Sequence, residues 1–167
     1  MAVILITGGA RSGKSRRAEL RARSFAGRPV YIATAEALDA EMDERIAKHR
    51  ARRGNDWIER EVPLDLVEVL SETDGGGARL VDCLTLWLSN LLHAGRDWSQ
   101  EVTRLADALS RQRGPVVLVT NEVGLGIVPD NALARTFRDA AGIMNQTIAG
   151  IADEVEFVVA GLPMKLK

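Results

Sequence analysis

The fold is decided by the stretch Gly8-Gly9-Ala10-Arg11-Ser12-Gly13-Lys14-Ser15, which fits the phosphate-binding pattern G-x-x-x-x-G-K-[ST] of a P-loop. Its glycines let the backbone wrap around phosphate groups, and the N–H groups at the start of the following helix point toward the anion. Lys14 can reach β- and γ-phosphate oxygens, and Ser15 can supply a hydroxyl ligand to Mg²⁺. The alternative, a chance match, is expected only roughly 0.003 times in a chain of this composition.

The segments around this loop predict an α/β fold. Residues 3–6 form a fully apolar run just before the loop, and a helix is expected over about residues 13–25. Other short apolar runs predict buried strands at residues 30–33, 80–82, 116–119 and 156–160. Continuous apolarity is typical of strands in a parallel sheet, and segments of helical pattern separate these strands. We therefore expect one nucleotide-binding catalytic domain over residues 1–167, with a mainly parallel sheet, helices on both faces and the RecA-like architecture of P-loop NTPases.

Weaker patterns complete this outline. Further helices are expected at about residues 39–53, 84–93, 99–113 and 131–152, with a short helix at 64–70 and a possible strand around Trp57 and Ile58. The stretch Asp74-Gly75-Gly76-Gly77 is expected to form a turn or flexible loop and to be the segment most prone to disorder. After the last strand, the chain is expected to end in a short tail.

Composition excludes several classes of function. Of the 167 residues, 46% are hydrophobic, which is enough for a sizeable core. The net charge is −1, so no global basic field suggests nucleic acid or an anionic membrane as a partner. Aromatic residues make up only 4%, which argues against a base-stacking platform. No apolar run approaches the ~20 residues of a membrane span, and the one cysteine, Cys83, suggests a reducing compartment. We therefore expect a cytoplasmic protein with small-molecule substrates.

Acidic residues near the ends of two other expected strands are candidates for chemistry. Asp82 is placed to hold Mg²⁺ or its water shell, although it could instead cap the following helix. Glu122 could orient substrate or water, or could cap the turn at Gly124-Leu125-Gly126. The guanine-reading pattern N-K-x-D is absent, because Asn121-Glu122-Val123-Gly124 lacks both Lys and Asp. Residue chemistry alone therefore leaves the nucleotide base undetermined.

Residues 44–53 combine several cations with one histidine. On a helix, Arg45, His49 and Arg53 would share one face. Clustered cations suit polyphosphate and would favour the neutral, nucleophilic form of the His49 imidazole. From the residues alone, a solvated charged face with an incidental histidine stays open as the alternative. His93, at the end of an apolar helix, fits a group that caps the helix C-terminus better than a catalyst.

Five segments together carry a resemblance. They read T-G-G-A-R-S-G-K-S at 7–15, Y-I-A-T at 31–34, R-I-A-K-H-R at 45–50, V-D-C-L-T at 81–85 and V-T-N-E-V-G-L-G-I-V-P at 119–129. In this combination the chain resembles, over essentially its whole length, the bifunctional adenosylcobinamide kinase / adenosylcobinamide-phosphate guanylyltransferases of cobalamin biosynthesis. The P-loop alone would not single out this family, but its exact form together with the last segment is specific.

The resemblance implies two reactions. In the first, the hydroxyl of the aminopropanol arm of adenosylcobinamide takes the γ-phosphoryl group of ATP or GTP. In the second, GTP guanylylates a histidine of the enzyme and releases pyrophosphate, and the GMP then passes to adenosylcobinamide phosphate to give adenosylcobinamide-GDP. The resemblance also implies that Mg²⁺ binds with the nucleotides. It further implies that the protein forms a homo-oligomer, namely a trimer.

Carried over residue by residue, the resemblance assigns the catalytic roles to His49, as the guanylylated residue, and to Lys14. It implies that Ser15 and Asp82 hold the metal. The implied nucleotide-binding residues are Gly8, Gly9, Ala10, Arg11, Ser12, Gly13, Lys14, Ser15, Thr34, Ala35, Glu36, Arg50, Ala51, Arg52, Arg53, Glu61 and Asp82. The cations beside His49 then gain a use, because arginines stabilise charge on an α-phosphate.

Two other functions compete with this one. A single-activity P-loop kinase of another small hydroxyl substrate would need Lys14, Ser15 and Asp82 but no covalent histidine. A nucleotide-binding regulatory module would use the P-loop as a switch without catalysis. Covalent labelling by GTP separates both from the bifunctional enzyme.

Overall fold

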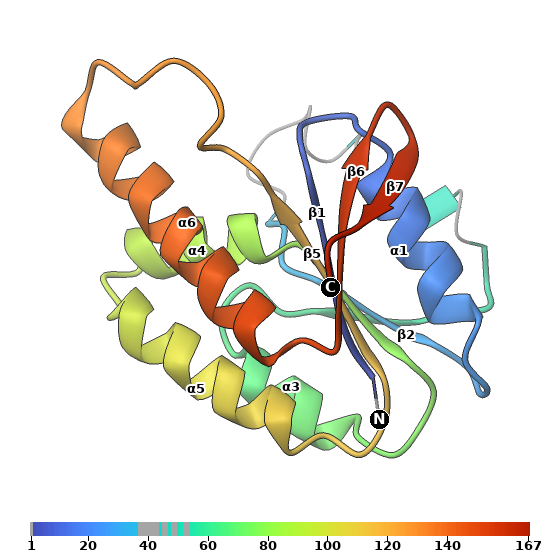
Figure 1. The fold of residues 1–167 in the computed structure, drawn as a ribbon. Helices are drawn as coiled ribbons and strands as arrows, with labels where there is room; N and C mark the ends of the chain where they lie inside the picture. Colours follow the sequence, from blue (N-terminus) through green and yellow to red (C-terminus); the bar gives the residue numbers. More distant parts are fainter. Residues whose placement is uncertain (1, 37–43, 45–46, 48–49, 52–53) are drawn as a thin grey trace.

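The computed structural model describes residues 2–36, 44, 47, 50–51 and 54–167 (Figure 1). Its strands are β1 (Val3–Gly8), β2 (Val30–Ala33), β3 (Ile58–Glu61), β4 (Arg79–Asp82), β5 (Val116–Asn121), β6 (Glu154–Val159) and β7 (Leu162–Lys165). Its helices are α1 (Lys14–Arg23), α3 (Leu66–Glu72), α4 (Leu84–His93), α5 (Trp98–Ser110) and α6 (Ala132–Ile151). Within the described residues, no helix is long and apolar enough to span a membrane.

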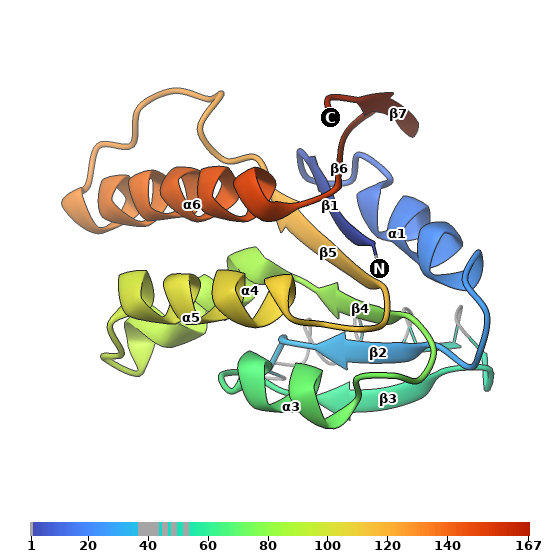
Figure 2. The ribbon, with the colours of Figure 1, turned by 60° about the horizontal axis from the view of Figure 1, so that its bottom comes forward.

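The strands form one sheet in the order β3-β2-β4-β5-β1-β6-β7. Every neighbouring pair is parallel except β6 and β7, which are antiparallel. Helix α1 covers one face of this sheet, and α3, α4, α5 and α6 cover the other (Figures 1 and 2). The prediction of a mainly parallel sheet with helices on both faces is confirmed.

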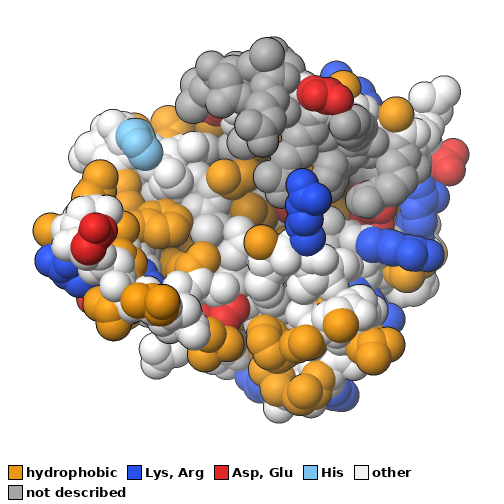
Figure 3. All heavy atoms as spheres, turned by 90° about the horizontal axis from the view of Figure 1, so that it is seen from above, with side chains coloured by type: hydrophobic (Ala, Val, Ile, Leu, Met, Phe, Trp, Pro, Cys, Tyr) orange, Lys and Arg blue, Asp and Glu red, His pale blue; other side chains and the backbone are white. Residues whose placement is uncertain are grey.

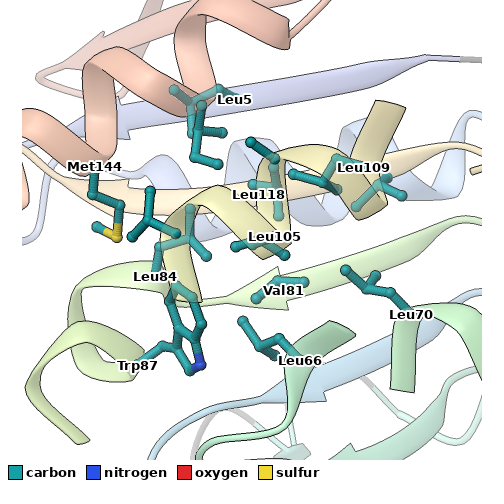
Figure 4. Packing of buried hydrophobic residues seen from close by; sticks show 14 of the residues in the cluster. Leu5, Leu66, Leu70, Val81, Leu84, Trp87, Leu105, Leu109, Leu118 and Met144 are labelled. Atoms are coloured by element: carbon teal, nitrogen blue, oxygen red, sulfur yellow. The ribbon is translucent and has the colours of Figure 1, made fainter. Parts of the chain in front are cut away.

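Two apolar layers explain why the central strands are apolar throughout. The larger layer lies between the sheet and helices α3–α6, where strand residues such as Leu5 and Leu118 belong to the same buried cluster as Trp87 of α4 (Figure 4). The smaller layer lies against α1, where Ile4 and Ile6 belong to the same cluster as Ala18 and Ala22 of that helix. Successive residues of β1 therefore alternate between two buried layers, which is the pattern expected of a central parallel strand.

The end of the chain is a strand rather than the tail that the sequence led us to expect. Strand β7 pairs with β6 in the register Val159 with Leu162. Ala160 and Gly161, with φ of 52° and 80°, form the two-residue turn between them, and turns with two positive φ angles match the twist of a hairpin. Pro163 is tolerated because β7 is the edge strand of the sheet.

The loop over residues 74–77 is also more ordered than expected. The Asp74 carboxylate accepts hydrogen bonds from the backbone N–H groups of Gly75, Arg113 and Gly114. It also forms an ion pair with the buried Arg79, at 3.1 Å. These bonds join the glycine-rich loop to the start of β5, so the expectation of disorder was wrong. The partners lie up to 40 residues away in the sequence, where no local pattern reveals them.

Candidate functional site

The P-loop connects β1 to α1 at the edge of the sheet where the parallel strands have their carboxyl ends. Arg11 and Gly13 adopt left-handed φ angles of 54° and 96°, which turn the backbone into the helix. Gly13 is the N-cap residue of α1 and has no side chain with which to cap it. The first N–H groups of α1 therefore lie at the loop, in the arrangement that binds anions.

Lys14 brings a positive charge into this loop. Its side chain is 9% exposed, and its Nζ donates a hydrogen bond to the carbonyl oxygen of Gly9 at 2.9 Å. The ammonium group is therefore held over the glycines, where a polyphosphate would be wrapped by the backbone. The contact of Lys14 with nucleotide phosphates stays a prediction.

The β6–β7 hairpin supports the loop from the side. The N–H of Gly161 donates to the carbonyl oxygen of Ser12 at 2.8 Å. A Cβ atom on Gly13 would lie 3.1 Å from Cα of Gly161, and one on Gly8 would lie 2.6 Å from the carbonyl oxygen of Val158. Two of the motif glycines are therefore needed for close contact with the hairpin as well as for wrapping phosphate. Sequence reasoning missed this support.

Ion pairs join the same hairpin to the helix that follows the loop. Arg17 of α1 makes two bonds to the carboxylate of Glu156 in β6, of 2.6 and 2.7 Å. Arg21 bonds to both Glu156 and Glu154 at 2.9 Å. Glu156 is 4% exposed, and its hydrogen bonds with Arg17 hold the pKa of this carboxyl below its ordinary value. The P-loop and its helix are thus anchored to the C-terminal hairpin.

Asp82 lies at the carboxyl end of β4 and its carboxylate is oriented by a tyrosine. The hydroxyl of Tyr31, a buried residue of β2, donates to Oδ2 of Asp82 at 2.8 Å. The N-cap residue of α4 is Cys83, so the structure does not support the alternative in which Asp82 caps that helix. The carboxylate is instead held at the edge of the sheet that carries the P-loop.

The charges of Lys14 and Asp82 both affect the pKa of the Cys83 thiol. Burial, the largest cause, and the charge of Asp82 raise the pKa of this thiol to about 11, whereas the charge of Lys14 acts in the opposite direction. Both charges therefore lie near Cys83. The raised pKa also keeps the thiol protonated at neutral pH, so Cys83 is not a nucleophile.

The donor set fits a magnesium ion that is held partly by nucleotide phosphates. Mg²⁺ prefers hard oxygen ligands and is commonly bound through one or two carboxylates together with substrate phosphates. Asp82 offers a carboxylate at the end of β4, and Ser15 offers a hydroxyl in the first turn of α1. Tyr31 bonds to Oδ2 of Asp82 and so fixes the orientation of this carboxylate.

The predicted nucleotide contacts that follow β2 lie at the same edge, but Thr34 has a structural task. Its side chain is fully buried, and its hydroxyl donates to the carbonyl oxygen of Cys83 and accepts from the Cys83 N–H. Thr34 thereby fixes the junction between β4 and α4. Ala35 is half-buried and Glu36 is exposed, so the residues after Thr34 reach the surface. Their contact with nucleotide stays a prediction.

Two predicted contacts from distant parts of the chain are paired with each other. Arg50 bonds to Glu61 at 3.0 Å and to Glu59 at 2.6 Å, both on the edge strand β3. Arg50 and Glu61 are therefore brought together, and both are exposed, as is Ala51. Their role with nucleotide stays a prediction. Three other predicted site residues, His49, Arg52 and Arg53, lie outside the described residues.

Glu122 and His93 have local partners. Oε1 of Glu122 accepts from the N–H of Gly124 at 2.6 Å, which is the turn-capping alternative, and its backbone N–H donates to the carbonyl oxygen of Gly8. His93 ends α4, and its Nδ1 lies 2.7 Å from the carbonyl oxygen of Ser89. His93 thus lies in the last turn of α4 with its ring beside a carbonyl oxygen of its own helix, and the C-cap residue is Ala94.

Comparison with protein families and curated proteins gives matches along almost the whole chain. The family model described as cobinamide kinase / cobinamide phosphate guanyltransferase matches residues 4–166. A Pseudomonas aeruginosa protein named bifunctional adenosylcobalamin biosynthesis protein CobP is 50% identical over 98% of this chain and 96% of its own length. The Salmonella typhimurium protein named bifunctional adenosylcobalamin biosynthesis protein CobU is 43% identical over 99% of both chains.

Solved structures show the same fold at low sequence identity. An ATPase from the type III secretion system of pathogenic bacteria superposes with a TM-score of 0.55 and 12% identity, over 98% of this chain and 56% of that one. A Pyrococcus horikoshii OT3 protein has a TM-score of 0.52 and 12% identity, over 99% of this chain and 86% of that one. The first is a nucleotide-hydrolysing protein, so the fold agrees with the P-loop NTPase architecture that the sequence predicts.

Proposed function

The chain belongs to the cobinamide kinase / cobinamide phosphate guanyltransferase family and is a bifunctional enzyme of adenosylcobalamin biosynthesis, and we propose that one phosphate cradle at the carboxyl edge of its sheet serves both reactions. The observation that carries this proposal is the geometry of the P-loop. Lys14 is held over the loop glycines at the uncapped start of α1, and Asp82 is held at the same edge. Both reactions begin with a nucleoside triphosphate, so both need such a cradle.

In the kinase reaction, the loop N–H groups and Lys14 bind the β- and γ-phosphates of ATP or GTP. The hydroxyl of adenosylcobinamide attacks the γ-phosphorus, and the nucleoside diphosphate leaves. Ser15 and Asp82 are the residues that would hold Mg²⁺, which supplies charge neutralisation for the phosphates when bound. Tyr31 holds Asp82 in place through the hydrogen bond to its Oδ2.

For the guanylyltransferase reaction, we propose that His49 is the nucleophile. A neutral imidazole nitrogen attacks the α-phosphorus of GTP, pyrophosphate leaves, and the GMP group then passes to adenosylcobinamide phosphate. Arg50, Arg52 and Arg53 stabilise the charge on the α-phosphate, and Ala35, Glu36, Ala51, Glu61 and Asp82 complete the nucleotide contacts. Thr34, whose buried hydroxyl bonds to Cys83, supports these contacts by fixing the junction between β4 and α4. Support comes from the family and from the position of His49 beside Arg50 in the sequence.

A labelling experiment tests this proposal. The full chain is incubated with Mg²⁺ and GTP carrying ³²P at the α-phosphate, and the polypeptide is then treated with acid or base. A phosphoramidate on histidine is acid-labile and base-stable, so the expected label has that profile. Phosphorylation of adenosylcobinamide without any such label would support the single-activity kinase instead.

We also propose that the chain forms a homo-oligomer, with a trimer as the form implied by the resemblance. Hydrophobic side chains are exposed in two places around the carboxyl edge of the sheet (Figure 3). One comprises the loop before α6 and its first turn, and the other the C-terminal hairpin; the residues are Leu125, Ile127, Val128 and Leu133, and Val159, Leu162, Met164 and Leu166. Light scattering measures the mass of the assembly directly. We also propose that the enzyme acts in the cytoplasm, where ATP and GTP are available as substrates.

A further inference from the structure

Asn121 occupies the central position of the candidate site without a role in it so far. Strand β5, which ends at Asn121, lies between β1, which leads into the P-loop, and β4, which ends at Asp82. Asn121 pairs with Gly8, the first glycine of the loop, whereas Asp82 pairs with Val119. Asn121 is therefore about 7 Å beyond the level of Asp82, toward the end of the sheet where the nucleotide is proposed to bind.

The alternation of side chains along β5 places the Asn121 carboxamide on the face of the sheet that carries α1. The neighbouring Thr120 points to the opposite face, because its hydroxyl donates to Oδ1 of Asn145 in α6. Val117 and Val119 belong to the apolar cluster that contains Ala18 of α1. Since successive residues of a strand point to opposite faces, Asn121 shares the face of Val119 and of the P-loop helix.

The backbone of Asn121 is fixed by side chains from two helices. Its N–H donates to Oγ1 of Thr85 in α4 at 2.7 Å, and its carbonyl oxygen accepts from Nδ2 of Asn145 in α6 at 3.2 Å. The next residue, Glu122, donates its N–H to the carbonyl oxygen of Gly8. The backbone of Asn121 is thus fixed beside the loop, so its side chain starts from a defined position, which favours a group that must meet a transferring phosphoryl.

We propose that Asn121 is a catalytic residue of the kinase reaction, whose carboxamide N–H donates to an oxygen of the γ-phosphoryl group during transfer. This rests on the proposed function, in which the P-loop holds the triphosphate. In the step, the cobinamide hydroxyl oxygen bonds to the γ-phosphorus, and the bond from that phosphorus to the β–γ bridging oxygen breaks. The nucleoside diphosphate leaves with the electron pair, and the hydroxyl proton passes to solvent. A neutral amide suits this place, because it donates without changing the charge beside Asp82.

Asn121→Ala is expected to lower kcat for phosphorylation of adenosylcobinamide about 100-fold, the usual effect of removing one donor to a transition state. The dissociation constant of ATP should change less than threefold. The guanylylation rate should fall less than the kinase rate, because that attack is on the α-phosphorus. Asn131→Ala is the matched control: Asn131 caps α6 through its Oδ1 and lies in the loop beyond the site, so its loss should lower Tm and leave both rates unchanged.

Two further variants keep the test decisive. Asn121→Asp preserves the shape of the side chain but replaces the donor with a negative charge, so its kinase kcat should fall at least as far as in Asn121→Ala. The proposal is overturned if the kinase kcat falls less than tenfold in both Asn121→Ala and Asn121→Asp. It is also overturned if the kinase and guanylylation rates fall equally, or if only the affinity for nucleotide is lost. Lys14→Ala distinguishes this from a failure of the proposed function. If Lys14→Ala also leaves the kinase rate intact, the P-loop assignment itself is wrong.

Discussion

At the carboxyl edge of the sheet, Lys14 and Asp82 lie beside a loop of glycines, whereas at the amino edge Asp74 and Arg79 form an ion pair with each other. Both pairs of residues are charged and largely removed from water. At the amino edge, backbone N–H groups point at the carboxylate of Asp74. At the carboxyl edge, the N–H groups at the start of α1 point into the loop. At the amino edge the protein itself supplies the anion, Asp74, and the charges stabilise the fold. At the carboxyl edge the anion would be a bound phosphate, and the charges form a candidate binding site.

The largest expected effect comes from the carboxyl edge. Lys14→Ala removes the cation of the cradle, so kcat/KM should fall by at least about 100-fold for both reactions. The free energy of unfolding should fall by about 1 kcal/mol, the value of a hydrogen bond such as the one that Lys14 donates to the carbonyl oxygen of Gly9. Steady-state kinetics and thermal denaturation measure the two effects. Unchanged rates for both reactions would mean that the P-loop does not hold the nucleotide.

The opposite pattern is expected at the amino edge. Asp74→Ala leaves the buried Arg79 without its counterion and frees the N–H groups of Arg113 and Gly114. The free energy of unfolding should fall by about 3 kcal/mol, as measured by urea denaturation. Activity per folded molecule should stay at the wild-type level. Asp107→Ala, which removes an exposed carboxylate on α5, is the control and should cost less than about 0.5 kcal/mol. Loss of activity in folded Asp74→Ala would contradict the prediction that the amino edge affects stability but not catalysis.

Acid should also lower the free energy of unfolding, because it protonates Asp74 at the amino edge. Burial alone would raise the pKa of Asp74, but hydrogen bonds from Gly114 and Arg113 and the charge of Arg79 lower it to about 2. Since an unfolded aspartate has a pKa of about 4, the ionised carboxylate stabilises the fold above that pH. About 2 kcal/mol should therefore be lost as the pH falls from about 4 through about 2. Urea denaturation across this range checks it, and Asp74→Asn should remove this part of the pH dependence.

A smaller effect is expected where the hairpin supports the P-loop. Gly161→Pro removes the N–H that bonds to Ser12, whereas Gly161→Ala keeps it and places Cβ where no atom lies within 4 Å. Alanine can adopt the left-handed φ of 80° at a cost of about 1–2 kcal/mol, whereas proline, whose φ is fixed near −65°, cannot. KM for ATP should therefore rise at least about five- to tenfold more in Gly161→Pro than in Gly161→Ala, because the proline variant loses both the hydrogen bond to Ser12 and the turn of the hairpin. Equal KM values in the two variants would show that the hairpin does not position the loop.

Local patterns predicted what depends on neighbours in the sequence. The apolar runs gave β1, β2, β4 and β5, and the spacing of the motif placed Gly13 at the start of α1. Contacts between distant residues escaped prediction. The hydroxyl of Thr34 bonds to Cys83, which is 49 residues away in the sequence. Because no local pattern reveals this partner, the sequence alone leaves the Thr34 hydroxyl as a candidate for binding nucleotide. Strand β7 was missed because its pairing depends on a positive φ at Ala160, which is uncommon for a residue other than glycine.

The candidate site divides along the same line. The P-loop could be read from its own residues, and Asp82 from its place after an apolar strand. The position of Asn121 beside Gly8 becomes visible only from the strand register, because β5 inserts between β1 and β4. Likewise Tyr31 gains a role only when β2 is found beside β4.

The central claim is that one cradle serves two reactions and that a protein nucleophile is needed for only one of them. His49→Asn keeps a polar side chain but removes the attacking nitrogen, whereas γ-phosphoryl transfer needs no covalent intermediate with the protein. The direct measurement is to assay this variant for covalent GMP labelling and for phosphorylation of adenosylcobinamide in the same preparation. The account predicts that labelling is lost while phosphorylation stays measurable. Undiminished labelling of His49→Asn, or loss of phosphorylation together with labelling in a folded variant, would contradict it.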